Sequence, residues 1–154
     1  MSPHRARILV AAPAIVIRQL GTALPADVDV IGAATWEDAV QRLSEAPPQL
    51  IVVCYIFDEM RPYRYITHVR SSASKRAPII LIRAVTVPLG ATLESEVRRS
   101  YTALGVNAFL NFSDLANEHG LDHALQEFAQ LVASFLRTPG GPGSPRDSSK
   151  SSAP

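Results

Sequence analysis

The chain has 154 residues, of which 47% are hydrophobic and 19% charged, with a formal net charge of +1. This is enough chain for one domain with a proper hydrophobic core, and the composition is globular rather than disordered. The charge balance gives no basic surplus that would draw the body to nucleic acid, and a single cysteine suits a reducing cytoplasm because it cannot form an internal disulfide.

The first third of the chain predicts two strands, each followed by a helix, and then a third strand. The strands are expected at 7–12, 28–34 and 49–56, and the helices at 15–24 and from Thr35 to Pro47. The Thr35 hydroxyl suits a helix N-cap, and acidic residues follow it in the first turn. The third strand is apolar without alternation, which is typical of a parallel strand covered on both faces. The apolar run at 8–17 is too short to span a bilayer, so we expect no membrane segment there.

The rest of the body continues the alternation of helix and strand. Helices are expected at 62–72, 93–105 and 121–136, and strands at 78–85 and 107–112. Five strands alternating with five helices predict an α/β fold, a three-layer, flavodoxin-like or receiver-like doubly wound sheet of five parallel strands. We assign residues 1–137 to this domain. Residues 138–154 are almost entirely Pro, Gly, Ser and charged, which predicts a disordered tail.

Three segments of this body resemble strands of bacterial response-regulator receiver domains. The stretch PQLIVVC (48–54) is similar to the strand that ends in the phosphorylated aspartate of receivers. The stretches APIILIRA (77–84) and GVNAFLNF (105–112) resemble the fourth and fifth receiver strands. The resemblance covers residues 5–137 and rests on the order of elements and on pattern rather than on one specific motif. It implies a receiver fold and a place in two-component signal transduction.

The residues that perform phosphotransfer in receivers are missing from the matching positions. The phosphoacceptor position falls on Cys54, and the acidic pair that holds magnesium falls on the stretch Ala11, Ala12 and Pro13. The switch Ser or Thr falls on Arg83, and the phosphate-contacting Lys falls on Phe112, followed by Ser113. Aspartyl phosphorylation needs a carboxylate, a metal ion and a cation that holds the product. The resemblance therefore implies a degenerate receiver, with no catalytic residues, metal or other cofactor, and Asp58 and Glu59 are interpreted as loop residues.

A receiver-like domain without phosphotransfer is expected to act through protein contacts. Receivers dock partners on the face around the fourth helix and fifth strand, which here corresponds to Val97, Tyr101 and Phe109. The expected partner is a protein, whether a signalling kinase, a regulator or a second copy of the chain, and the expected location is cytoplasmic. Nucleic acid is not expected as a partner.

Several other interpretations stay open at the level of sequence. Cys54 could be the thiol of a redox sensor, with Arg83 as its counter-charge, although a free cysteine is more often a small buried hydrophobe. A small flavodoxin-like enzyme is a further alternative, but no acid–base constellation supports it. His119 and His123 have the spacing of a metal pair without a third ligand. A basic stretch with interleaved tyrosines suits either a nucleic-acid surface or a solvated helix; it comprises Arg61, Tyr63, Arg64, Tyr65, Arg70, Lys75 and Arg76.

Overall fold

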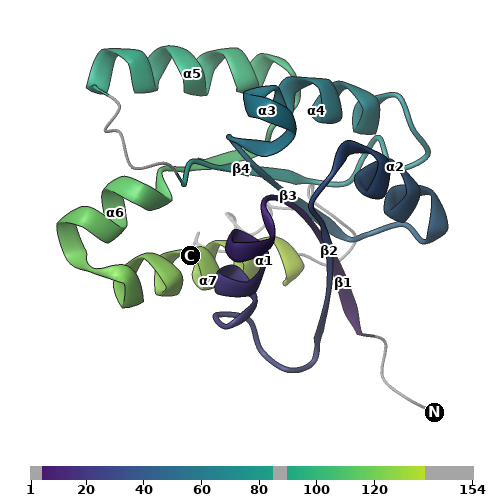
Figure 1. Ribbon diagram of the computed structural model, residues 1–154, viewed down its shortest axis with the longest axis horizontal. Coiled ribbons are helices and arrows are strands. Elements are labelled where there is room, and N and C mark those ends of the chain that lie inside the picture. The colour runs from purple at the N-terminus through teal and green to yellow at the C-terminus, as the bar shows by residue number, and fades with distance from the viewer. Residues whose placement is uncertain (1–4, 85–89, 138–154) are drawn as a thin grey trace, which may run out of the picture.

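A computed structural model describes residues 5–84 and 90–137 of the chain, which form one sheet of five parallel strands (Figure 1). The strands are β1 (Ala6–Ala11), β2 (Val28–Ala33), β3 (Leu50–Cys54), β4 (Ile79–Ile82) and β5 (Ala108–Leu110), in the spatial order β2-β1-β3-β4-β5. The predicted fold class is confirmed. Every residue of β3 and β4 is buried, which explains why their sequences are apolar without alternation.

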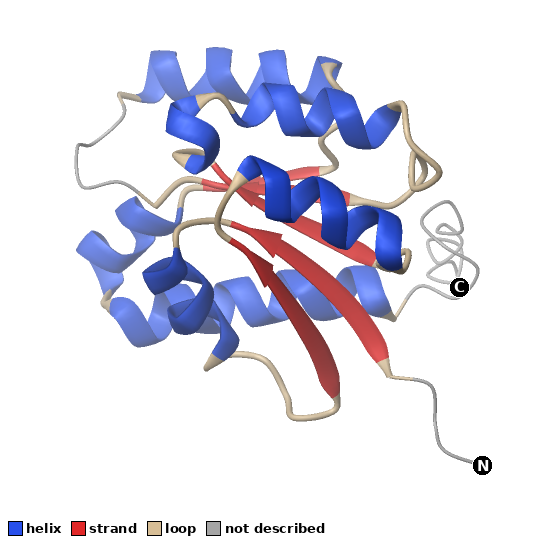
Figure 2. Cartoon of the chain, turned by 45° about the vertical axis from the view of Figure 1, so that its right-hand side comes forward, coloured by secondary structure: helices blue, strands red, loops and turns tan. Residues whose placement is uncertain are grey.

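Helices cover both faces of this sheet (Figures 1 and 2). Helices α1 (Ala14–Gly21) and α7 (Leu121–Leu136) lie on one face. Helices α2 (Trp36–Glu45), α4 (Pro62–Arg70) and α5 (Ala91–Ala103) lie on the other. The two short helices α3 (Phe57–Met60) and α6 (Phe112–His119) begin at the carboxyl edge of the sheet, the edge at which the strands end. No helix within the described residues is long and apolar enough to cross a membrane.

The helix predicted after Thr35 is present with its predicted cap. The Thr35 hydroxyl accepts a hydrogen bond from the backbone N–H of Asp38 at 3.1 Å. This bond satisfies one of the N–H groups that a helix start leaves without a partner. The buried hydroxyl of Tyr65 in α4 donates to the carbonyl of Ala39 in α2 at 2.8 Å. The two helices are thereby joined on one face of the sheet.

The prediction of five helices was wrong, because α3 and α6 were read as loop or strand. Phe112, expected at the end of a strand, is instead the first residue of α6. The signal for α6 is local: the Asn111 side chain caps the helix by accepting from the N–H of Asp114. Gly120, with φ of 96°, then separates α6 from α7 in a conformation that favours glycine.

The helix expected at 121–136 has apolar residues spaced along one side from Leu121 onward, and the structure leaves the start of this side exposed. Ala124, Phe128 and Val132 are buried against the sheet, whereas Leu121 is 43% exposed in the first turn. The end of the strand predicted at 78–85 and the tail predicted at 138–154 lie outside the described residues.

Candidate functional site at the carboxyl edge of the sheet

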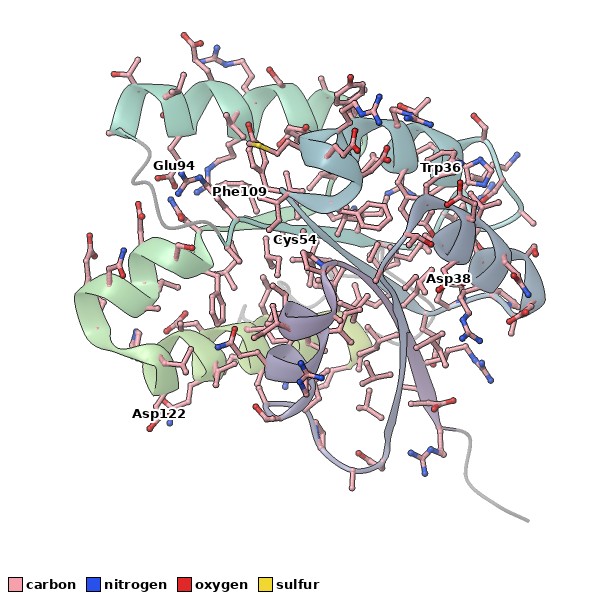
Figure 3. All side chains as sticks on the ribbon, in the orientation of Figure 1. Trp36, Asp38, Cys54, Glu94, Phe109 and Asp122 are labelled. Carbon is pink, nitrogen blue, oxygen red and sulfur yellow. The ribbon has the colours of Figure 1, made fainter. Side chains whose placement is uncertain are left out.

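Cys54 ends β3 at the centre of the carboxyl edge and is completely buried (Figure 3). Its register partner in β4 is Ile82. Burial raises the pKa of the Cys54 thiol above its ordinary value, since a buried thiolate loses its hydration. Backbone N–H groups of Ile56, Ala84 and Tyr55 act in the opposite direction and only partly offset this effect. At neutral pH the side chain is therefore a neutral, covered thiol.

The end of β1, beside Cys54 in the sheet, carries no acidic group. Ala11 and Ala12 are fully buried, and Pro13 precedes the first residue of α1. In Figure 3 the labelled acids Asp38, Glu94 and Asp122 lie away from Cys54, on three different helices. Within the described ranges no group of three His, Cys, Asp or Glu side chains is placed to hold a metal ion. The position of Cys54 thus has an apolar neighbour where a hard cation would need oxygen ligands.

Arg83 follows β4 at the same edge and is only 3% exposed. Its Nη1 donates to Asn111 Oδ1 at 3.5 Å and lies 3.8 Å from Asp114 Oδ1. A buried arginine is tolerated only when its charge and its N–H groups have partners. The β5–α6 junction provides such partners in Asn111 and Asp114.

The polar network around Arg83 reaches α5 as well. Asn111 Nδ2 donates to Glu94 Oε1 at 3.2 Å and to Asp114 Oδ2 at 3.0 Å. Glu94 in turn pairs with Arg98 at 2.9 Å, one turn further along α5. We name Arg83, Glu94, Arg98, Asn111 and Asp114 the edge network. It joins the end of β4, the start of α6 and the first half of α5. From the sequence, Arg83 was expected inside the strand at 78–85, and no pattern indicated this network.

Phe112 is the last of the residues that the sequence comparison placed at receiver site positions. Its side chain is 4% exposed and belongs to the hydrophobic core. The structure therefore brings Ala12, Cys54 and Arg83 to one edge of the sheet, where all three are buried. Phe112, the first residue of α6, is buried at the same edge. Their surroundings are apolar or, at Arg83, already neutralised by the edge network.

Asp58 and Glu59 lie in α3, whose backbone is left-handed. Asp58, Glu59 and Met60 have φ values of 58°, 57° and 63°, the left-handed helical region that residues with a side chain rarely adopt in succession. Pro62 restricts only Arg61, the residue before it, which is kept out of the right-handed helical region at φ −122° and ψ 51°. The chain cannot enter α4 by continuing one right-handed helix, and it reverses through a left-handed turn.

The Asp58 carboxylate is held by two guanidinium groups beside an open cleft. Asp58 Oδ1 lies 3.7 Å from Arg61 and Asp58 Oδ2 lies 3.4 Å from Arg64, with the Asp58 side chain only 10% exposed. Arg64 also lies over the Trp36 ring at 4.6 Å. The cleft has a volume of about 490 Å³ and extends from Pro13 across the start of α2 to this turn. Asp58 therefore forms ion pairs that hold the turn, and its carboxylate is not a free nucleophile.

The face predicted to dock partners is only partly at the surface. Val97 and Tyr101 in α5 are half-buried, and no residue of α5 is fully buried. Phe109 is 8% exposed and is covered by the Arg98 guanidinium at 4.9 Å from its ring, so it lies beneath the face rather than on it. Tyr101 packs edge-on against Tyr55, and burial is the main reason that its pKa is raised to about 12.

The other sequence candidates have structural roles or remain exposed. The rings of His119 and His123 lie 4.9 Å apart and pair with Glu118 and Glu127 at the surface.

Much of the basic stretch around α4 has internal partners. Arg61 and Arg64 pair with Asp58, and Arg70 donates to the carbonyls of Lys75, Ala77 and Gly105. Arg70 therefore holds the end of α4 to the loop before β5, and the stretch does not present one free basic face.

Comparison with known proteins gives a clear result only for the fold. No protein-family model matches the chain, and a search of curated proteins finds no matching sequence. Solved structures do match it over most of its length. A response regulator from Hahella chejuensis is similar with a TM-score of 0.67 and 13% identity, covering 87% of this chain and 96% of that one. The chain has the receiver fold.

Two further structures support this assignment of fold. The response regulator domain of Thermotoga maritima CheB is similar with a TM-score of 0.62 and 17% identity, over 87% of this chain and 95% of that domain. The chemotaxis response regulator CheY4 of Vibrio cholerae has a TM-score of 0.61 and 20% identity, over 84% of this chain and 99% of that one. The similarity thus spans nearly the whole receiver domain at low sequence identity.

Proposed function

We propose that this chain is a receiver-fold signalling domain that works through protein contacts without aspartyl phosphorylation. The observation that carries the proposal is the buried thiol of Cys54 at the end of β3, beside Ala12 and Pro13. A phosphoacceptor must be a carboxylate that a metal-bound phosphodonor can reach. Cys54 is a buried thiol and not a carboxylate, and Ala12 and Pro13, which follow β1, offer no oxygen ligand from their side chains.

The edge network supports the absence of a phosphate-driven switch. In a switching receiver, the side chain after the fourth strand moves toward the phosphoryl group. Here that position is Arg83, which is buried and held by Asn111 and Asp114. The network links Arg83 through Asn111 to Glu94 of α5, so the face formed by α5 is tied to one arrangement. In the proposed domain the surface of α5 has the same conformation at all times and does not depend on phosphorylation.

We place the partner-binding surface on α5, around Val97 and Tyr101. The support is that α5 has no fully buried residue and that Leu93 in its first turn is 54% exposed. A helix with so little of its own surface covered is suited to burial against another chain. The partner is a protein, whether a signalling kinase, a regulator or a second copy, in the cytoplasm.

The test is partner capture that depends on this face and not on phosphodonor. Wild-type protein, Val97→Asp and Tyr101→Ala are used as baits in an extract of the native cell, with Ser134→Asp at an exposed position of α7 as a matched control. We expect one or more proteins that the wild type and the control retain and that both α5 variants lose, with no effect of magnesium and acetyl phosphate. Equal capture by all four baits, or capture only after acetyl phosphate, would contradict the proposal.

The redox-sensor alternative is distinguished by the reactivity of Cys54. The raised pKa and complete burial of the thiol favour slow alkylation by a small maleimide in the native protein. Alkylation as fast as in the denatured chain near neutral pH would move the sensor hypothesis to first place. The small-enzyme alternative has no comparable support, since the carboxyl edge combines a neutral thiol with ion pairs that are already formed.

A further inference from the structure

An apolar groove lies at the amino edge of the sheet, opposite the candidate site. It has a volume of about 370 Å³. One wall is the turn after α1 and the start of β2, with Leu24, Pro25 and Val28, and the other is the last turns of α7, with Ala129, Ala133 and Leu136. Figure 2 shows the end of α7 close to the starts of β1 and β2 at this edge. Small-molecule sites commonly measure roughly 300–1,000 Å³ and are mainly apolar.

The groove exists because α7 is narrow where it passes this edge. Ala129 and Ala133 are four residues apart and therefore lie on the same side of the helix. Their methyl groups are too short to reach the opposite wall of the groove. Larger residues at either position would close it. Binding of an apolar ligand to this open surface is favourable, because it removes apolar area from water.

The charges on the rim favour an anionic group on that ligand. Arg5 and Arg137 both line the groove and are exposed, and neither forms an ion pair with any residue that the structure describes. Arg5 Nη2 donates to the carbonyl of Ala26 at 2.9 Å, which holds this guanidinium at the rim. Asp27 is the single acidic residue among the lining residues, so the rim has a net positive charge. Guanidinium groups bind carboxylates well because their N–H donors match the two oxygens.

We propose that this amino-edge groove binds a free, medium-chain aliphatic carboxylate. The alkyl chain lies between α7 and the starts of the two strands, over Ala129 and Ala133, and the carboxylate lies between Arg5 and Arg137. The proposal is independent of the protein-contact function, which concerns the opposite edge and α5.

The first test is calorimetric titration of the full chain with hexanoate, octanoate and decanoate, each below the concentration at which it forms micelles. The affinity should rise about fourfold for each added methylene that the groove still covers. It should level off once the chain fills the groove. The alcohols of the same lengths should bind more weakly, because they lack the charge that Arg5 and Arg137 accept. No saturable binding in the series, or equal binding of acid and alcohol, would overturn the proposal.

The second test locates the ligand with variants and methyl NMR. Ala133→Leu should abolish decanoate binding by filling the groove. Arg137→Gln should lower the affinity for all three acids without changing the increase in affinity per added methylene. Ala91→Leu, on exposed α5, is the matched control and should bind as the wild type does. Decanoate should shift the methyl signals of Ala129 and Ala133. Loss of binding in Ala91→Leu, or shifts at Ala91 instead, would contradict the placement.

Two other occupants are distinguished in the same experiments. If residues 138–154 fill the groove, a chain ending at Arg137 should shift the Ala129 methyl signal without ligand and bind decanoate more tightly. If the groove is a membrane contact, the protein should sediment with phosphatidylglycerol vesicles and should not bind the soluble acids. Either result would overturn the proposal of a free carboxylate.

Discussion

Cys54 occupies the place of a reactive residue, but its side chain is not reactive in this setting. The end of β3 is where the receiver fold places its reactive group, yet here the side chain is buried among apolar strands. The sequence predicted its location, since the apolar run from Leu50 onward and the turn after it are local patterns. The sequence also predicted burial of the thiol in a strand covered on both faces, and burial raises a thiol pKa, which is the direction found. The backbone groups that oppose this shift belong to the loops around Cys54 and were not predicted.

The raised pKa of Cys54 predicts a loss of stability at alkaline pH. The thiol ionises in the unfolded chain near its ordinary value of 9.0 but stays protonated in the folded protein, whose thiol pKa is higher. The unfolded state therefore binds fewer protons above that pH, and the free energy of unfolding should fall by about 1.4 kcal/mol per pH unit there. Below the unfolded pKa this contribution is fully present. Urea denaturation between about pH 8 and pH 10 measures the slope.

Cys54→Ala is the matched variant for this prediction. It should lose about 1–2 kcal/mol at neutral pH through lost packing. It should also lack most of the decline between about pH 8 and pH 10, because no thiol remains to ionise. The same alkaline slope in wild type and variant would assign the decline to other groups.

At the scale of the element, the left-handed turn α3 shows a conflict between local preference and the path of the chain. Each residue with a side chain in this region costs about 1–2 kcal/mol. Ion pairs of Asp58 with Arg61 and Arg64 hold the turn in place, and Arg61 Nε also donates to the Asp58 carbonyl at 3.2 Å. The acidic residues in this stretch gave no sign of a left-handed turn. Pro62 restricts Arg61 alone, so no local pattern indicated the left-handed turn.

Glycine at position 59 should therefore stabilise the protein. Glu59 has φ of 57° and its side chain is 86% exposed, so Glu59→Gly relieves backbone strain and removes little packing. We expect a gain of about 0.5–1 kcal/mol after the greater entropy of glycine in the unfolded chain is included. Thermal and urea denaturation measure it. Glu96→Gly, at an exposed right-handed position of α5, should instead destabilise by about 1 kcal/mol. Destabilisation by both variants would show that the turn is not strained.

Asn111 shows how one side chain serves two elements. Its Oδ1 caps α6 and its Nδ2 donates to Glu94 of α5. Asn111→Ala should therefore lower the free energy of unfolding by about 1–2 kcal/mol. It should also perturb backbone amide signals in the first half of α5. Asn117→Ala, at an exposed position in the same helix, should change stability by less than about 0.5 kcal/mol. Equal effects of the two variants would show that the Asn111 side chain does not stabilise α5 and α6.

At the scale of the whole molecule, the alternation of apolar runs and helical spacing predicted the sheet correctly. The order of the strands was not predicted, although right-handed crossovers between parallel strands leave few arrangements. The edge network and the amino-edge groove could not be predicted in the same way. Arg83, Asn111 and Glu94 meet only through tertiary packing, and the groove depends on the distance between α7 and a turn far away in sequence.

We propose that this receiver fold does not accept a phosphoryl group. Intact-mass spectrometry after incubation with acetyl phosphate and magnesium tests it most directly, with a phosphorylation-competent receiver domain in the same reaction as the positive control. We predict that the control gains one phosphoryl mass while this chain and its folded Cys54→Asp variant stay unmodified, because Ala12 and Pro13 cannot ligate magnesium. A stoichiometric, base-labile adduct on the wild-type chain, mapped to Asp58, would contradict the account.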